Sequence, residues 1–262
     1  MKKTIPAIAL SLILLFAGVS GLLSALAEDD YEDFSDFDSN METEFFDWEE
    51  EEFFDEEAEY RAAAEYSQTK ESINAASRYS NPDLMFDGDY GYFVSEDRTS
   101  CTTALYIGQD TDVEIPSRLG GLPVEVIGDH TFSNLGFIES VTVPDGVKQI
   151  GKQAFFKCSG LRSIYLPEGV TGIGDQCFGG CSVLDEISVP QSLETVGEMA
   201  FLGCFTLHEI TFGTSLKTIG PDAFNACYEL GRVTVPSENV YIEENAFAQC
   251  PEELERIFAD RV

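Results

Sequence analysis

Basic side chains are scarce in this sequence. Its 262 residues include 15 Lys and Arg against 48 Asp and Glu, which gives a formal net charge of −33 at pH 7. Binding to nucleic acid or to an anionic membrane surface requires a basic patch, so the composition argues against both functions. A negative charge of this size favours solubility outside the cell, or attraction to a cationic partner.

Histidine is scarcer still, because His130 and His208 are the only two in the chain. We find no Ser-His-Asp or Cys-His arrangement around them and no glycine motif for binding phosphate. Acidic residues are abundant, but abundance does not create a positioned acid–base pair. The sequence therefore predicts a protein that is not an enzyme, with no catalytic residue, no cofactor and no metal. A hydrolase that uses two surface carboxylates is the alternative from the enzyme class.

The first 27 residues have the pattern of a secretion signal. Lys2 and Lys3 precede an apolar run at residues 7–16, and the small residues Ala25 and Ala27 flank Leu26 as at a cleavage site. We expect residues 1–27 to be a cleaved signal peptide, and the mature protein to be secreted or associated with the cell surface without membrane insertion. An uncleaved anchor is the competing interpretation, since apolar character persists to Ala27.

Residues 28–84 form an acidic region with interleaved aromatic side chains. Eighteen Asp or Glu and no Lys or Arg occur between residues 28 and 60, and repulsion at this charge density opposes collapse. We expect residues 28–84 to be disordered, with one marginal helix near residues 56–78. A solubilising spacer, a disordered ligand for a partner, and weak calcium adsorption all remain open as roles.

Strand-forming residues dominate the start of the next region. Asn81 and Pro82 interrupt the chain, and two runs at residues 90–94 and 100–107 are rich in strand formers. They predict a hairpin within residues 85–111 that closes the N-terminal end of a folded domain at residues 85–262.

A period of 23 residues organises that domain. The period is visible in three sets of residues: Phe132, Phe155, Phe178, Phe201, Phe224 and Phe247; Cys158, Cys181, Cys204, Cys227 and Cys250; and Ile127, Ile150, Ile173, Val196, Ile219 and Ile242. A fixed period of this length indicates a solenoid, because one unit cannot bury its own apolar face. We expect the repeats to span residues 112–250.

Each repeat contains a short strand that should stack on its neighbours. Leu161, Ile164 and Leu166 alternate as in a strand, and stacked coils form parallel strands about 4.8 Å apart. The first repeat is longer, with residues 117–123 expected as an extra loop. Gly213 replaces the repeat proline and Asn239 interrupts the valine column, so the last coil is expected to be irregular. Residues 251–262 are expected to form a C-terminal cap with a short helix.

The pattern P-x-x-V-x-x-I-G-x-x-A-F-x-x-C-x-x-L-x-x-I-x-L-P resembles the BspA-type leucine-rich repeat. The hairpin sequence DGDYGYFVSED also resembles the segment that often precedes such repeats. This resemblance implies a β-rich α/β solenoid, a right-handed coil of 23-residue repeats with an N-terminal β-hairpin cap and a short C-terminal cap helix. Members of the family are bacterial and protist surface or secreted proteins implicated in adhesion, matrix-protein binding and coaggregation. The resemblance therefore implies a non-catalytic, adhesion-like role.

The seven cysteines allow three interpretations. A secreted protein with regular cysteines invites disulfides, but equivalent cysteines on adjacent coils lie side by side without the converging Cβ vectors of a bridge. A zinc site needs four ligands that meet at one point, whereas a column spreads them along a line. Buried free thiols that serve as apolar positions are the interpretation that we expect to hold.

The outward residues of the stacked strands are the candidate binding surface. Solenoids commonly bind partners on this face, and Tyr165 is the candidate aromatic anchor. The predicted partner is an extracellular protein or glycan, with a basic patch as one option, and the chain is expected to be a monomer. The alternative function is an accessory scaffold of an extracellular enzyme or assembly, which binds through the acidic region. The proposed contact residues are Ser140, Thr142, Ser163, Tyr165, Glu186, Ser188, Glu209, Thr211, Arg232 and Thr234.

Overall fold

The computed structural model describes residues 81–236 and 239–258. The expected signal peptide at residues 1–27 lies outside the described residues. The same is true of the acidic region up to residue 80 and of the final residues 259–262.

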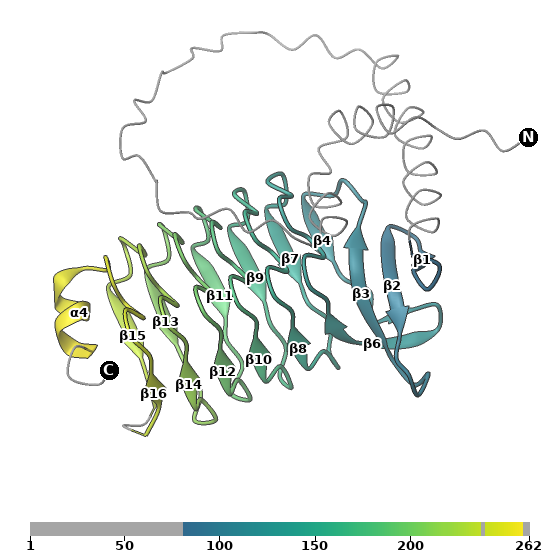
Figure 1. The fold of residues 1–262 in the computed structure, drawn as a ribbon. Helices are drawn as coiled ribbons and strands as arrows, with labels where there is room; N and C mark the ends of the chain where they lie inside the picture. Colours follow the sequence, from purple (N-terminus) through teal and green to yellow (C-terminus); the bar gives the residue numbers. More distant parts are fainter. Residues whose placement is uncertain (1–80, 237–238, 259–262) are drawn as a thin grey trace, which may run out of the picture.

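Two rows of short parallel strands run along the solenoid (Figure 1). The first row consists of three-residue strands, and equivalent residues of successive coils pair in register, as Val141, Ile164 and Ile187 do. We call its outward side the ladder face. Its strands are β4 (Asp112–Glu114), β7 (Ser140–Thr142), β9 (Ser163–Tyr165), β11 (Glu186–Ser188), β13 (Glu209–Thr211) and β15 (Arg232–Thr234).

The second row forms a continuous sheet on the other side of each coil. Apart from the first strand it is built from pairs of residues, and its parallel register repeats the 23-residue period, for example Ile173 opposite Val196. Its strands are β6 (Leu122–Ile127), β8 (Gln149–Ile150), β10 (Gly172–Ile173), β12 (Thr195–Val196), β14 (Thr218–Ile219) and β16 (Tyr241–Ile242). The predicted 23-residue solenoid is therefore the observed architecture.

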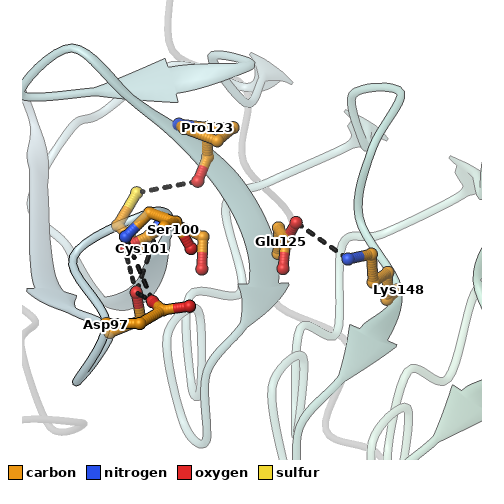
Figure 2. Close-up of polar contacts among 8 residues, drawn as sticks. Asp97, Ser100, Cys101, Pro123, Glu125 and Lys148 are labelled. Carbon is orange, nitrogen blue, oxygen red and sulfur yellow. Dashed lines mark hydrogen bonds and ion pairs between the residues drawn. The ribbon is translucent and has the colours of Figure 1, made fainter.

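Antiparallel strands precede the repeats. The predicted strands occur as β2 (Tyr90–Val94) and β3 (Cys101–Tyr106), which pair with each other. A further strand that the sequence analysis did not predict, β1 (Met85–Asp87), pairs with the outer edge of β2. Strand β3 then pairs parallel with β6, so this unit continues the second sheet. Figure 2 shows the join, where the Cys101 thiol faces the Pro123 carbonyl at 3.4 Å.

Residues 117–123, predicted as an extra loop, are instead a tight hairpin. Strand β5 (Arg118–Leu119) pairs antiparallel with the start of β6. Gly120 and Gly121 form its turn with φ values of +56° and +82°. Two successive residues with positive φ suit the twist of a two-residue hairpin, and glycine adopts them without a steric cost. The loop prediction was therefore wrong, because it ignored the turn chemistry of the paired glycines.

A continuous stack of phenylalanine rings fills the core. Rings of Phe132 to Phe247 in successive coils lie 4.9 to 5.4 Å apart and nearly parallel. The rings of Tyr106 and Phe258 continue this stack beyond Phe132 and Phe247, at 5.2 and 4.4 Å. Burial of each ring stabilises the fold by about 2–3 kcal/mol. The stack explains why phenylalanine recurs at this position.

The turn around each Ala-Phe pair requires left-handed backbone that the sequence analysis did not predict. Two residues per coil have positive φ, for example Gln153 at 54° and Lys157 at 56°. Such a conformation costs of order 1 kcal/mol for a residue other than glycine. Hydrogen bonds between coils offset this cost, as from the Phe155 amide to the Cys177 carbonyl at 2.9 Å. Glycine at positions 180 and 203 of the same column was the available signal.

The cysteine column is buried and hydrogen-bonded. All seven cysteines are free and buried, which confirms the expected burial. Each thiol of the column donates to the carbonyl of a phenylalanine one coil earlier, as Cys158 does to Phe132 at 3.1 Å. Burial raises the pKa of Cys158 to about 12. The cysteines of the column therefore donate hydrogen bonds, which their apolar neighbours in the core cannot do.

The C-terminal end carries the one described helix, α4 (Glu252–Phe258). Leu254 and Phe258 are buried on it. Within residues 81–236 and 239–258, no helix combines the length and apolar character needed to cross a membrane.

Candidate partner-binding surface

The ten predicted contact residues lie on β7, β9, β11, β13 and β15. In each strand they flank a central residue that points into the core, because side chains of a strand alternate between its two faces. Eight of the ten are exposed. Ser140 and Ser163 are half-buried, so they contribute less surface than predicted.

Tyr165 is the largest side chain on this face and is 48% exposed. It lies on β9 between Thr142 of β7 and Ser188 of β11, which are its register partners. Both neighbours are smaller and hydrogen-bonding, so the ring stands above a polar surface. This arrangement suits an anchor residue at an interface.

Charged groups on the face interact along the columns. Arg232 Nη1 lies 3.3 Å from Glu209 Oε2 one coil earlier, and the Ser140 hydroxyl donates to the Asp112 carboxylate. Exposed pairs of this kind contribute about 0–1 kcal/mol to stability. Among the described residues Glu186 pairs with no cation, so its charge is available to a partner.

The ladder face is divided into two parts, contrary to the regular ladder predicted from the period. Strands β4, β7, β9 and β11 form one sheet, and β13 and β15 form another. Gly213, which replaces the repeat proline after β13, lies close to the preceding coil, since an added Cβ would be 2.4 Å from the Gln191 Cα. The proline of the other repeats cannot fit there. The break between β11 and β13 was not predicted, and the last coil also departs from the repeat, because Val240 is buried there and Asn239 is exposed.

A second group of exposed residues was missed by the sequence analysis. The rings of Phe205 and Tyr228 stack at 5.3 Å, and both side chains are exposed. The exposed imidazole of His208 lies between the carboxylates of Asp185 and Glu229, at 3.1 Å from each. The available signal was a departure from the repeat, since serine occupies the ring position in the two preceding coils.

No group of His, Cys, Asp and Glu within residues 81–236 and 239–258 is arranged to hold a metal ion. A hollow of about 370 Å³ lies beside the ion pair of Glu194 and Lys217, which are 2.6 Å apart. The hollow is shallow and its other lining residues are Thr214, Ser215, Leu216 and Asn239. Thr214 and Ser215 supply hydroxyl groups there, but the two charged side chains, Glu194 and Lys217, are paired with each other.

These stacked columns define a leucine-rich repeat solenoid. Residues 125–253 match the sequence model of the BspA type leucine rich repeat region in six copies. Residues 125–253, just under half of the chain, are therefore repeats of the BspA type. No match was found among curated proteins.

Three solved structures show the same fold. A leucine rich cell surface protein from Faecalibacterium prausnitzii is 30% identical with a TM-score of 0.56, over 64% of this chain and 46% of its own. The leucine-rich repeat protein of T. pallidum is 26% identical with a TM-score of 0.59, over 68% and 95%. One from Bacteroides ovatus is 27% identical with a TM-score of 0.55, over 63% and 44%. The chain thus spans less than half the length of the first and third.

Proposed function

We propose that this protein is a non-catalytic, extracellular interaction protein that binds a protein or glycan through the ladder face. The observation that carries the proposal is the composition of that face: its inward positions are uniform, whereas its outward positions differ from coil to coil. The fold requires only the inward ones. The outward side chains, with Tyr165 at their centre, are therefore free to serve recognition.

The extracellular placement rests on the sequence and on one relative. Residues 1–27 have the signal pattern, and the chain carries a net charge of −33. The similar Faecalibacterium prausnitzii protein is described as a cell surface protein. An adhesion-like role is consistent with both. The matching family and the three relatives named above carry no enzyme in their descriptions.

The two ends of the solenoid serve as caps in this proposal. At the N-terminal end the Tyr90 and Tyr106 rings pack on each other and on Phe132, and burial raises the pKa of Tyr90. A buried Thr103–Thr131 hydroxyl pair at 3.1 Å also joins β3 to the first coil. Helix α4 covers Phe247 at the other end. Closed ends keep a solenoid soluble and leave its faces for binding.

Binding to a panel of extracellular proteins and glycans tests the proposal. Tyr165→Ala combined with Glu186→Lys should weaken binding of a captured ligand about tenfold or more, since an anchor ring and an unpaired charge are both altered. Thermal unfolding should be nearly unchanged. Unchanged affinity for every ligand found would refute the role of the ladder face.

The acidic region offers the second candidate surface, in an accessory scaffold. Deletion of residues 28–80 distinguishes the acidic region from the ladder face as the binding surface, because the described residues begin at Asn81. If this deletion abolishes binding while the ladder variants retain it, the acidic region is the binding segment. Circular dichroism and thermal unfolding should first show that the shortened chain is folded.

A further inference from the structure

A second stack of aromatic rings lies on the outside of the solenoid. The rings of Phe205 and Tyr228 are 5.3 Å apart with 8° between their planes, and the side chains are 42% and 56% exposed. They occupy equivalent positions of successive coils, directly after the cysteine column. Ser159 and Ser182 hold that position in earlier coils. The fold therefore does not require an aromatic ring there.

Carboxylates accompany this stack. Glu229 directly follows Tyr228, and its Oε2 lies 3.1 Å from Nε2 of His208. On the other side of the imidazole, Nδ1 lies 3.1 Å from Oδ1 of Asp185. The three side chains are more than half exposed, at 61% for His208, 59% for Asp185 and 54% for Glu229. We call Phe205, Tyr228, Asp185, His208 and Glu229 the acidic aromatic patch.

We propose that the acidic aromatic patch binds an arginine-bearing, basic segment of a partner protein. The patch shares no residue with the ten ladder residues of the proposed function, but it adjoins them, because Asp185 precedes Glu186 and His208 precedes Glu209. A guanidinium group is planar and weakly hydrated, so it packs on aromatic rings and also donates to carboxylates in a fork. Each carboxylate contacts His208 through one oxygen, which leaves its second oxygen as an acceptor for a guanidinium N–H.

Charge complementarity selects this partner. The patch belongs to a chain with a net charge of −33. Of the two neighbouring cations, Arg232 is paired with Glu209, and Arg162 holds the position of Asp185 one coil earlier. A neutral glycan would pack on the rings and donate hydroxyls to the carboxylates, but it would leave their negative charge uncompensated. A lysine side chain would use the charge but gain less from the rings, because its ammonium is compact and strongly hydrated. Arginine uses both features.

Two synthetic peptides of equal length and charge test the proposal, one with arginine and one with lysine between glycine and serine spacers. Their affinities for the full-length protein are measured by isothermal titration calorimetry at low ionic strength. We expect the arginine peptide to bind more tightly. Phe205→Ser with Tyr228→Ser should weaken its binding about fivefold or more, and should change binding of the lysine peptide much less.

Other coils of the repeat justify serine as the substitute for the two rings, and Tyr241 provides a control. Serine occupies the ring position in two other coils, so the double variant retains a sequence that this fold accepts. Tyr241→Ser removes a ring that is 64% exposed on the other sheet, and it should leave both affinities unchanged. Attraction of the peptides to the acidic residues 28–60 adds a second class of sites that is the same in all variants, so the titrations are fitted with two classes of sites. Tyr165→Ala should also leave arginine binding unchanged, which separates this site from the ladder face.

Unchanged arginine affinity in the folded double variant would overturn the proposal, as would an equal loss for both peptides. If the double variant does not fold, Asp185→Asn with Glu229→Gln replaces it. That pair should weaken arginine binding more than the equally charged control Glu96→Gln with Asp145→Asn, and equal effects would overturn the proposal. Binding of a neutral glycan that the ring variants abolish, without any arginine preference, would assign the patch to carbohydrate instead.

Discussion

The molecule contains two stacks of aromatic rings with nearly the same geometry and different surroundings. In the core, Phe178 and Phe201 lie 5.1 Å apart and are fully buried. On the surface, Phe205 and Tyr228 lie 5.3 Å apart and are about half exposed. The spacing of both follows from the stacking of coils, which places equivalent residues at the distance between neighbouring strands.

Position within the repeat, and not ring geometry, therefore decides what a stack does. An aromatic residue that points inward removes its whole surface from water and stabilises the fold. An aromatic residue four positions later in the repeat, as Phe205 is after Phe201, points outward and leaves its surface for a partner. Predictions that separate the two stacks test this difference.

The largest effect is expected for the core stack. Phe178→Ala should lower the free energy of unfolding by about 3–5 kcal/mol, because it removes buried surface and leaves a cavity between two stacked rings. Phe205→Ser should change it by about 0.5 kcal/mol or less. Urea unfolding followed by circular dichroism measures both. Comparable losses would show that the outer stack also stabilises the fold.

A smaller loss of stability is expected for substitution of Cys204, which lies between the core stack and the outer stack in the sequence. Cys204 is buried and directly precedes the exposed Phe205. Its thiol donates to the Phe178 carbonyl at 3.3 Å, and that carbonyl also accepts from the Cys181 amide at 3.0 Å. Cys204→Ala should therefore cost about 1–2 kcal/mol, because the carbonyl keeps one hydrogen bond. Urea unfolding measures this cost.

The reactivity of thiols also distinguishes the buried cysteine column from the exposed position that follows it. Burial raises the pKa of Cys204 above its usual range, and the thiolate is the reactive form. Iodoacetamide at pH 8 should therefore label none of the native column and all seven cysteines after denaturation. A cysteine placed one residue later, by Phe205→Cys, should react rapidly in the native protein. Rapid labelling of the native column would contradict its burial.

The smallest effect is expected at His130, at the margin of the core stack. Burial lowers the pKa of His130 below its usual value near 6.5, although Asp129 opposes this shift. Between the two pKa values the unfolded chain binds more protons, so stability is full above about pH 6.5 and decreases as the pH falls. Glutamine holds this position in the next two coils. His130→Gln should therefore reduce the drop in Tm between pH 7.5 and 5.5, and an identical drop would contradict the prediction.

Much of the fold followed from the sequence because one repeat predicts all the others. Phe155 or Cys158 alone says little, but six and five copies at one period define inward columns and the register between coils. The strand positions that carry Tyr165 and Glu186 were predicted for the same reason. The break between β11 and β13 was not, because the period assigns the same register to every pair of coils and carries no signal for a lost pairing.

The acidic aromatic patch was missed for a related reason. Phe205 and His208 are ordinary surface residues when read singly, and their partners Tyr228, Asp185 and Glu229 belong to other coils. Periodicity determines which residues face the core, because burial follows the local alternation and spacing of side chains. The period also places Phe205 beside Tyr228 and Asp185 beside His208, because each pair is 23 residues apart. Only the tertiary structure decided that His208 also meets Glu229, since a contact between non-equivalent positions depends on rotamers that a repeating pattern does not encode.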